Sequence, residues 1–192
     1  MPTDPLVRFR RWFDEARRAR VPLPEAMALA TADAAGRPSV RFVLLKGADE
    51  RGFVFFTDAR SRKGRELREN PRASVAIYWD AVGKQVRIEG RTEGVAPAEV
   101  DRYWQTRPRE SRLAALSSTQ SAALAGRSSL VDRWRKFDRR YPGDKVPRPS
   151  YWTGFRLVPE TIEFWRHREH RLHDRDLFVR TRSGWSHTLL QP

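Results

Sequence analysis

Short segments rich in β-branched and aromatic residues recur along this chain, and turn sequences separate most of them. The stretches 33–36 (Asp-Ala-Ala-Gly) and 47–50 (Gly-Ala-Asp-Glu) are two such turns. Because parallel strands need a crossover helix between them, strands in direct succession argue against a doubly wound sheet. The pattern predicts a mainly β fold with peripheral helices, in which antiparallel strands form a closed or nearly closed barrel. The strands are expected at Ala26–Thr31, Ser39–Lys46, Gly52–Thr57, Ala73–Trp79, Gln85–Val95, Tyr151–Leu157, Thr161–Trp165, Asp176–Arg180 and Trp185–Leu189.

Helical spacing of apolar residues is confined to a few segments. Leu6, Phe9 and Trp12 predict a first helix that runs from Asp4 to about Ala19. Pro97 suits the first position of a second long helix, which Pro108 must interrupt. Shorter helices are expected at Arg62–Glu69, Glu110–Leu116 and Ser129–Tyr141. We therefore predict one domain over residues 1–192, with an N-terminal helix (1–21), a helical insertion (97–141) and C-terminal strands (142–192).

The chain carries a large positive charge, with 38 basic and 24 acidic residues and a net charge of +14. Such an excess favours polyanionic or phosphorylated ligands, and from charge alone nucleic-acid binding is the leading alternative to a small-molecule site. The basic residues are spread along the whole chain, so we interpret most of them as solvated surface. Cysteine is absent, no apolar run approaches the roughly 20 residues of a membrane span, and no signal-like stretch is found. We expect a cytoplasmic protein that does not contact a membrane.

Three segments could bind phosphate groups. In Ser61-Arg62-Lys63-Gly64, Ser61 can cap a helix whose first N–H groups would face an anion, and Gly64 would allow close approach of a ligand. Cations at a helix start are unfavourable against the helix dipole, which a bound phosphate would explain. The buried strand 41–46 is cationic at both ends. Tyr103, Arg107 and Ser111 offer two hydroxyls and a guanidinium, although Pro108 breaks the helical register after Arg107.

The densest segment lies near the C-terminus, where 162–165 (Ile-Glu-Phe-Trp) precedes 170–175 (His-Arg-Leu-His-Asp-Arg). In an extended segment Arg171, His173 and Arg175 would point to the same side, so an anion or an acidic partner is expected there. The even spacing of His167, His170 and His173 suggests a metal site as a competing hypothesis. Arginines are interleaved and no thiolate or obvious carboxylate joins the set, so no metal is expected.

In this order, these segments resemble the pyridoxamine 5′-phosphate oxidase family over nearly the entire chain. The residues at 162–165 and 170–175 look like the C-terminal signature of that family. Collinear support comes from 41–46, 61–63, 107–111, 120–121 and 151–156. Phe56 departs from the family in standing where a tyrosine is common, and Leu116 stands where a tryptophan often does.

The resemblance implies a split β-barrel that forms a homodimer and binds flavin mononucleotide (FMN) at the dimer interface. The implied reaction is oxidation of pyridoxine or pyridoxamine 5′-phosphate to pyridoxal 5′-phosphate, with O₂ reduced to H₂O₂. Arg171 and His173 would position the substrate ring, and Lys46, Tyr103, Arg107 and Ser111 would hold its phosphate. The implied FMN contacts are Arg41, Phe42, Val43, Leu44, Leu45, Lys46, Phe56, Thr57, Arg62, Lys63, Gln85, Gln120, Ser121, Trp165 and Arg175, with Arg62 and Lys63 at the FMN phosphate.

Besides a flavin carrier without turnover, two alternatives stay open. The first is a flavin oxidase of the same fold that acts on another aromatic substrate, as phenazine-pathway oxidases do. A substrate without phosphate has no use for Lys46, Tyr103, Arg107 and Ser111 together, which argues against it. The second is a basic nucleic-acid-binding module, which needs a contiguous basic face with stacking aromatics. The tryptophans here lie within apolar patterns, which indicates a core role.

Overall fold

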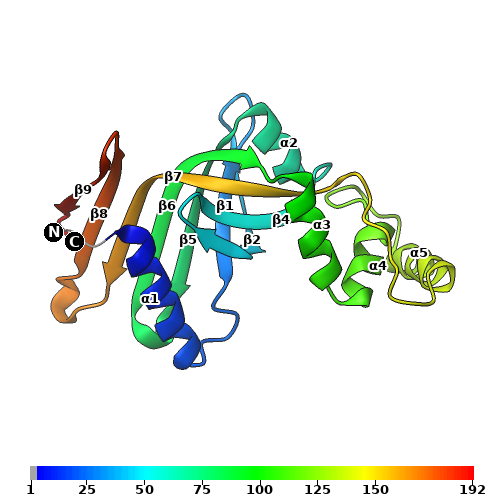
Figure 1. Cartoon of the computed structure of the whole chain (residues 1–192), viewed down its shortest axis with the longest axis horizontal. Helices are drawn as coiled ribbons and strands as arrows, with labels where there is room; N and C mark the ends of the chain where they lie inside the picture. Colours follow the sequence, from blue (N-terminus) through cyan, green and yellow to red (C-terminus); the bar gives the residue numbers. More distant parts are fainter. Residues whose placement is uncertain (1–3) are drawn as a thin grey trace.

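A computed structural model describes residues 4–192, and it shows a curled antiparallel sheet flanked by helices (Figure 1). This confirms the prediction of a nearly closed antiparallel barrel with peripheral helices. Within the described chain the strands are β1 (Ala26–Ala32), β2 (Pro38–Leu44), β3 (Gly47–Asp49), β4 (Gly52–Asp58), β5 (Arg72–Trp79), β6 (Lys84–Gly94), β7 (Trp152–Arg166), β8 (Asp174–Thr181) and β9 (Gly184–Leu189). The helices are α1 (Pro5–Arg18), α2 (Arg62–Glu69), α3 (Pro97–Thr106), α4 (Arg109–Ser117) and α5 (Arg127–Arg140), and short 3₁₀ turns span Asp80–Val82 and Glu169–Arg171.

The sheet follows the order β2-β1-β5-β6-β7-β4-β3, and β8 and β9 extend it from β7. The curl brings the end of β2 back to β4, where the Lys46 N–H donates to the Val54 carbonyl at 2.7 Å. The barrel is therefore split between β2 and β4, and the segment after β2 lies beside β4 at this opening. Figure 1 shows α3, α4 and α5 at one end of the molecule and the β8–β9 hairpin at the other.

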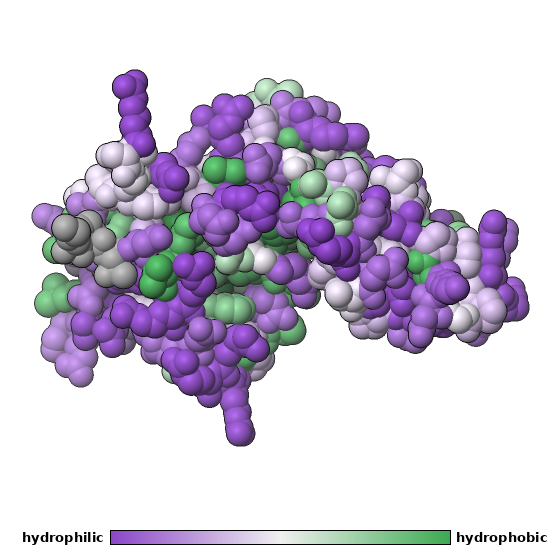
Figure 2. Space-filling model, viewed as in Figure 1, coloured by the Kyte–Doolittle hydropathy of each residue, from purple (hydrophilic) through white to green (hydrophobic). Residues whose placement is uncertain are grey.

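One hydrophobic core fills the inside of the curled sheet. Alternation along β1 turns Met27 and Leu29 inward, where both are fully buried. Helix α1 covers this core, since the Phe9 ring meets Phe53 edge-on at 4.8 Å and Trp12 meets Phe164 at 5.1 Å. The apolar spacing of the first helix therefore has the predicted role. On the outside, hydrophilic side chains cover most of the face seen in Figure 2.

A smaller cluster forms where the helical insertion meets the start of β7. Trp104, Leu113 and Val146 are buried together, and the Trp104 indole N–H donates to the Val146 carbonyl at 2.9 Å. This cluster fixes α3 and α4 against the connector that precedes β7. None of the helices described here is long and apolar enough to cross a membrane.

The structure corrects two strand predictions. The segments 151–157 and 161–165 form the single strand β7, because Glu160 bulges out of the ladder while Pro159 pairs with Gly90. A side chain at Gly90 would lie 2.0 Å from the Val158 carbonyl oxygen, so this bulge requires glycine opposite it. Residues 47–50, predicted as a turn, contain the short strand β3, which pairs with β4.

We had predicted that the C-terminal signature is extended, but the structure shows that part of it forms a turn. His170 and Arg171 have φ angles of 55° and 63°, and they form a tight turn before β8 begins at Asp174. Left-handed backbone is costly for such residues, so the surrounding contacts must hold this turn. The prediction that Arg171, His173 and Arg175 point to the same side of one extended segment is therefore wrong.

Candidate functional site

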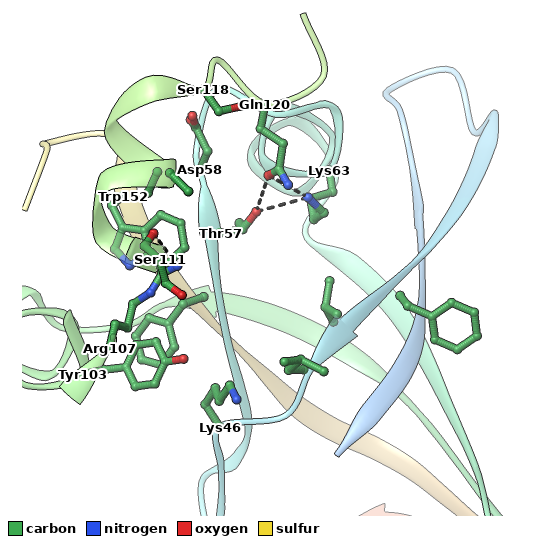
Figure 3. A pocket seen from close by; sticks show the side chains of 16 residues that line it. Lys46, Thr57, Asp58, Lys63, Tyr103, Arg107, Ser111, Ser118, Gln120 and Trp152 are labelled. Carbon is green, nitrogen blue, oxygen red and sulfur yellow. Dashed lines mark hydrogen bonds between the residues drawn. The ribbon is translucent and has the colours of Figure 1, made fainter. Parts of the chain in front are cut away.

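A cavity of about 420 Å³ lies between β2, β4, α3 and α4, within the size range of small-molecule and cofactor sites (Figure 3). Eleven of the residues proposed from the sequence line it, and they are Phe42, Val43, Leu44, Lys46, Phe56, Thr57, Lys63, Tyr103, Arg107, Ser111 and Gln120. Figure 3 shows Lys63, Thr57 and Gln120 gathered at one end, and Tyr103, Arg107 and Ser111 at the other. The cavity therefore has two separate groups of polar side chains.

The first group surrounds the N-terminus of α2. Ser61 caps the helix as predicted, since its hydroxyl accepts the Gly64 N–H at 3.2 Å. Lys63 is buried, and its ammonium donates to the Thr57 hydroxyl and to the Gln120 side-chain oxygen, both at 3.1 Å. Burial and the nearby Arg41 guanidinium lower the pKa of Lys63 to about 8. Within residues 4–192, no carboxylate lies within ion-pair distance of this ammonium.

The structure gives a packing reason for Gly64. A side chain there would lie 2.5 Å from the Ala59 carbonyl oxygen, so glycine is needed for close packing of α2 on the preceding turn. Ser121 lies beside the helix start, where its hydroxyl accepts the Arg62 N–H at 3.2 Å. Arg62 itself and Ser121 border the first group without lining the cavity.

Arg41 does not line the cavity and instead belongs to a hydrogen-bond network between β1, β2 and α2. Its guanidinium donates to Glu66, Thr31 and Ser39. Leu45, another proposed FMN contact, is buried in the core. Burial opposes ionisation of Glu66, but hydrogen bonds from Thr31, Ser39 and Arg62 prevail and lower its pKa to about 2. Glu66 is thus a buried carboxylate beside the cationic start of α2.

The second group is built around Arg107. Pro108 separates α3 from α4, as predicted, so Tyr103 and Ser111 reach the cavity from two different helices. The Arg107 guanidinium lies 4.0 Å from the centre of the Trp152 ring and donates to the Ser111 carbonyl at 3.0 Å. Its Nη1 is buried and has no hydrogen-bond partner in the described chain. Burial lowers the pKa of Arg107 because it disfavours the charged guanidinium, and a bound anion would offset this cost of burying the charge.

Tyr103 is held by an aromatic neighbour. Its ring stacks on Phe56 with centroids 4.0 Å apart and an interplanar angle of 11°. Burial raises the pKa of Tyr103, so its hydroxyl stays protonated and can donate. The hydroxyl that a tyrosine would add at position 56 is not needed for this stack.

The other proposed site residues form a separate group at the far end of β7. Gln85, Trp165 and Arg175 are direct neighbours across β6, β7 and β8. The Trp165 ring lies 4.5 Å from the His173 ring, and the Arg168 N–H donates to His173 Nδ1 at 3.1 Å. Arg171 is exposed on the tight turn beside them. The length of β7 separates this group from the cavity, where Trp152 lies at the opposite end of the strand.

The histidine spacing does not produce a metal site in the described residues. No group of three or more His, Cys, Asp or Glu side chains between positions 4 and 192 is placed to hold an ion. Only His167 and His173 come together, with ring centroids 5.4 Å apart.

Sequence reasoning missed several contributors to the site. Trp152, Asp58 and Ser118 line the cavity, and Glu66 connects Arg41 to Arg62 behind it. Trp152 had a sequence signal, because it begins the Trp-Thr-Gly-Phe-Arg segment already singled out. Glu66 had only its spacing of four residues from Arg62 as a signal, since its other partners, on β1 and β2, are distant in sequence.

Two family models cover the chain. Residues 13–166 match the family described as "Pyridoxamine 5'-phosphate oxidase", and residues 152–192 match the "Pyridoxine 5'-phosphate oxidase C-terminal dimerisation region". The pyridoxine/pyridoxamine 5′-phosphate oxidase of Gluconobacter oxydans is 47% identical over 192 residues, covering 100% of this chain and 96% of the relative. Its counterpart in Burkholderia thailandensis is 52% identical, covering 98% and 89% respectively.

Among solved structures, PhzG from Burkholderia lata 383, in complex with tetrahydrophenazine-1-carboxylic acid, superimposes with a TM-score of 0.95. It is 37% identical and covers 100% of this chain and 94% of PhzG. A pyridoxamine 5′-phosphate oxidase-related, FMN-binding protein from Nostoc punctiforme PCC 73102 has a TM-score of 0.78 at 19% identity, with both chains fully covered. The latter similarity concerns the fold alone.

Proposed function

Because this chain belongs to the pyridoxamine 5′-phosphate oxidase family, we propose that it is an FMN-dependent oxidase that converts pyridoxine and pyridoxamine 5′-phosphate to pyridoxal 5′-phosphate, with O₂ as electron acceptor. One observation carries this proposal: a single cavity has two separate groups of basic and hydroxyl side chains, one around Lys63 and one around Arg107. A phosphorylated cofactor and a phosphorylated substrate would each use one of them.

The group around Lys63 fits the phosphate of FMN. The Lys63 ammonium is buried at the capped N-terminus of α2 and has no carboxylate partner among residues 4–192, and the helix dipole adds positive potential there. Arg62 and the Ser121 hydroxyl lie beside it, and the exposed edge of β2 offers apolar surface to a ring system. When bound, FMN supplies the acceptor for the hydride that leaves C4′ of the substrate.

We assign the substrate phosphate to the group around Arg107. The guanidinium is fixed against Trp152 and retains a donor without a partner, so it is prepared for an oxyanion. Tyr103 and Ser111 would add hydroxyl donors, and Lys46 would add an ammonium from the end of β2. Arg171 and His173 would then position the pyridine ring.

This assignment requires two chains. Arg171 and His173 lie at the far end of β7 from the cavity of their own chain, so a second copy must bring them to it. The C-terminal match to a dimerisation region supports a homodimer. The outer face of the sheet offers a surface for it, because Val40 and Phe42 are 70% and 76% exposed beside the small Ala28 and Ala76.

A second candidate function comes from the similarity to PhzG, whose structure contains a tetrahydrophenazine carboxylic acid. A substrate of that class carries a carboxylate, which could also pair with Arg107. Steady-state oxidation assays with both phosphorylated vitamers and with tetrahydrophenazine-1-carboxylic acid distinguish the two. We expect turnover of the vitamers, and turnover of the phenazine precursor alone would transfer the assignment to the second function.

The purified protein is expected to be yellow and to release FMN on denaturation. The site has one phosphate-binding group at α2 for the cofactor, which suits a mononucleotide. Chromatography of the supernatant after heat denaturation identifies the flavin. A colourless protein that also fails to take up added FMN would contradict the proposal.

The affinity of the apoprotein for FMN is expected to be constant up to about pH 8 and to fall above it. Lys63 has a pKa of about 8 when no phosphate is present, and a bound dianion raises that pKa. Above pH 8, binding must therefore be accompanied by proton uptake, which weakens affinity by up to about tenfold per pH unit. Fluorescence titrations between pH 7 and 9.5 measure this effect, and Lys63→Arg should abolish the dependence. A constant affinity up to pH 9.5 in the wild type would contradict the titration of a phosphate-binding Lys63 near pH 8.

A further inference from the structure

Glu66 is a buried carboxylate in a region whose proposed role is to bind an anion. It lies on α2, one turn after Lys63, and is only 4% exposed. Its Oε1 accepts Arg62 Nε at 2.8 Å, and its Oε2 accepts Arg41 Nη2 at 3.2 Å. Oε2 also accepts the hydroxyls of Thr31 and Ser39 at 2.5 and 2.7 Å. Every hydrogen bond that reaches this carboxylate therefore comes from β1, β2 or the first turn of α2.

Glu66 joins two cations that would otherwise repel one another. Arg41 comes from β2 and lies close enough to the Lys63 ammonium to lower its pKa, and Arg62 comes from the start of α2, directly before Lys63 in the chain. Nη1 of Arg41 donates to the Leu29 carbonyl at 3.3 Å and to the Thr31 hydroxyl, so both terminal nitrogens of the guanidinium are hydrogen-bonded. Among the residues that the structure describes, Glu66 is the only side chain that hydrogen-bonds to both Arg41 and Arg62.

The charges of this cluster suit a phosphate monoester. Arg41, Arg62 and Lys63 are cationic and Glu66 is anionic, so the cluster carries two net positive charges. Asp58, the other nearby carboxylate, is already paired with Arg60 at 2.7 Å. A phosphate monoester carries roughly −1.5 to −2 at neutral pH.

We propose that Glu66 is a positioning residue for the cofactor phosphate, because it holds the guanidinium groups of Arg41 and Arg62 in place beside Lys63. It touches no ligand itself and acts through the two arginines. The inference rests on the proposed binding of FMN and assigns a function to a residue that does not line the cavity.

The proposal and simple electrostatics predict opposite changes in FMN affinity when the Glu66 carboxylate is removed. Removing a negative charge from a cationic site should strengthen anion binding by Coulomb's law alone. If Glu66 positions the arginines, Glu66→Ala should instead weaken FMN binding by about 10-fold or more, the factor for losing one charge-assisted phosphate contact. Glu66→Gln keeps the shape and one acceptor oxygen, so its FMN affinity should lie between those of the wild type and the alanine variant.

The experiment is a fluorescence titration of the apoproteins with FMN and, separately, with riboflavin, which lacks the phosphate. Glu66→Ala should lose affinity for FMN while its affinity for riboflavin stays at the wild-type level. Glu69→Ala is the matched control, since Glu69 is an exposed carboxylate on the same helix with no ion pair in residues 4–192. That variant should bind FMN as tightly as the wild type or slightly more tightly.

Three results would overturn the inference. They are tighter FMN binding by Glu66→Ala, unchanged FMN binding by that variant, and an equal loss of FMN and riboflavin affinity, which would indicate a role in folding alone. If Glu66→Ala does not fold, Glu66→Gln decides by the same comparison. Failure of the wild-type apoprotein to bind FMN would instead refute the proposed function, so the two failures can be told apart.

Discussion

Replacing Arg107 with alanine is expected to raise the KM for pyridoxine 5′-phosphate by roughly 10- to 150-fold, because a charge-assisted guanidinium–phosphate contact contributes about 1.5–3 kcal/mol. The guanidinium is fixed between the Trp152 ring and the Ser111 carbonyl, and its Nη1 lacks a partner. Its orientation is therefore set before the substrate arrives, and little further ordering is needed on binding. Steady-state oxidation of the phosphorylated vitamer measures the change.

Arg107→Lys should recover only part of the loss. An ammonium keeps the charge but loses both the planar contact with Trp152 and the two-pronged geometry toward phosphate. The FMN content of both variants should stay near that of the wild type, because the FMN phosphate is assigned to the separate group around Lys63. An unchanged KM in Arg107→Ala would remove Arg107 from the site of the substrate phosphate.

Periodicity in the sequence was sufficient to predict most of the sheet and of the core. The strand predicted at 26–31 forms β1, and the helix predicted from the spacing of Phe9 and Trp12 forms α1, whose aromatic face packs on the core. The segments 151–157 and 161–165 were predicted as separate strands, whereas both belong to the single strand β7. The reason lies in Gly90 on the neighbouring strand, which allows the bulge at Glu160, and no local pattern could reveal that pairing.

The parts of the candidate site that are formed by residues close together in the sequence were predictable. The capped start of α2 follows from Ser61 and from the cations after it. The partnership of Arg41 with Glu66 joins residues 25 positions apart, and the stack of Arg107 on Trp152 joins residues far more distant. The turn at His170 and Arg171 uses left-handed backbone that these residues adopt only under tertiary constraint, so an extended segment was the natural but incorrect expectation.

The separation of the proposed site residues into two groups is the main result that the sequence could not give. Lys46, Tyr103, Arg107 and Ser111 line one cavity, whereas Arg171 and His173 lie beyond the far end of β7. If both groups act on one substrate, each active site must take them from different chains of a twofold dimer. This is the central claim of the structural account.

A heterodimer of an Arg107→Ala chain with an Arg171→Ala chain tests that claim. One of its two sites would contain both alanines, and the other would contain both wild-type arginines. We therefore expect about half of the wild-type kcat/KM per dimer, although each homodimeric variant alone should be strongly impaired. Co-expression with two different affinity tags and tandem purification yields the heterodimer.

The matched control is a heterodimer of a wild-type chain with a chain that carries both substitutions. With sites shared between chains, each site of this control lacks one arginine, so its activity should stay as low as that of the single variants. Recovery to about half of wild-type activity in the first heterodimer, and none in the control, is the predicted result. The reverse pattern, with no recovery in the first and half activity in the control, would show that Arg107 and Arg171 act within one chain and would contradict the account.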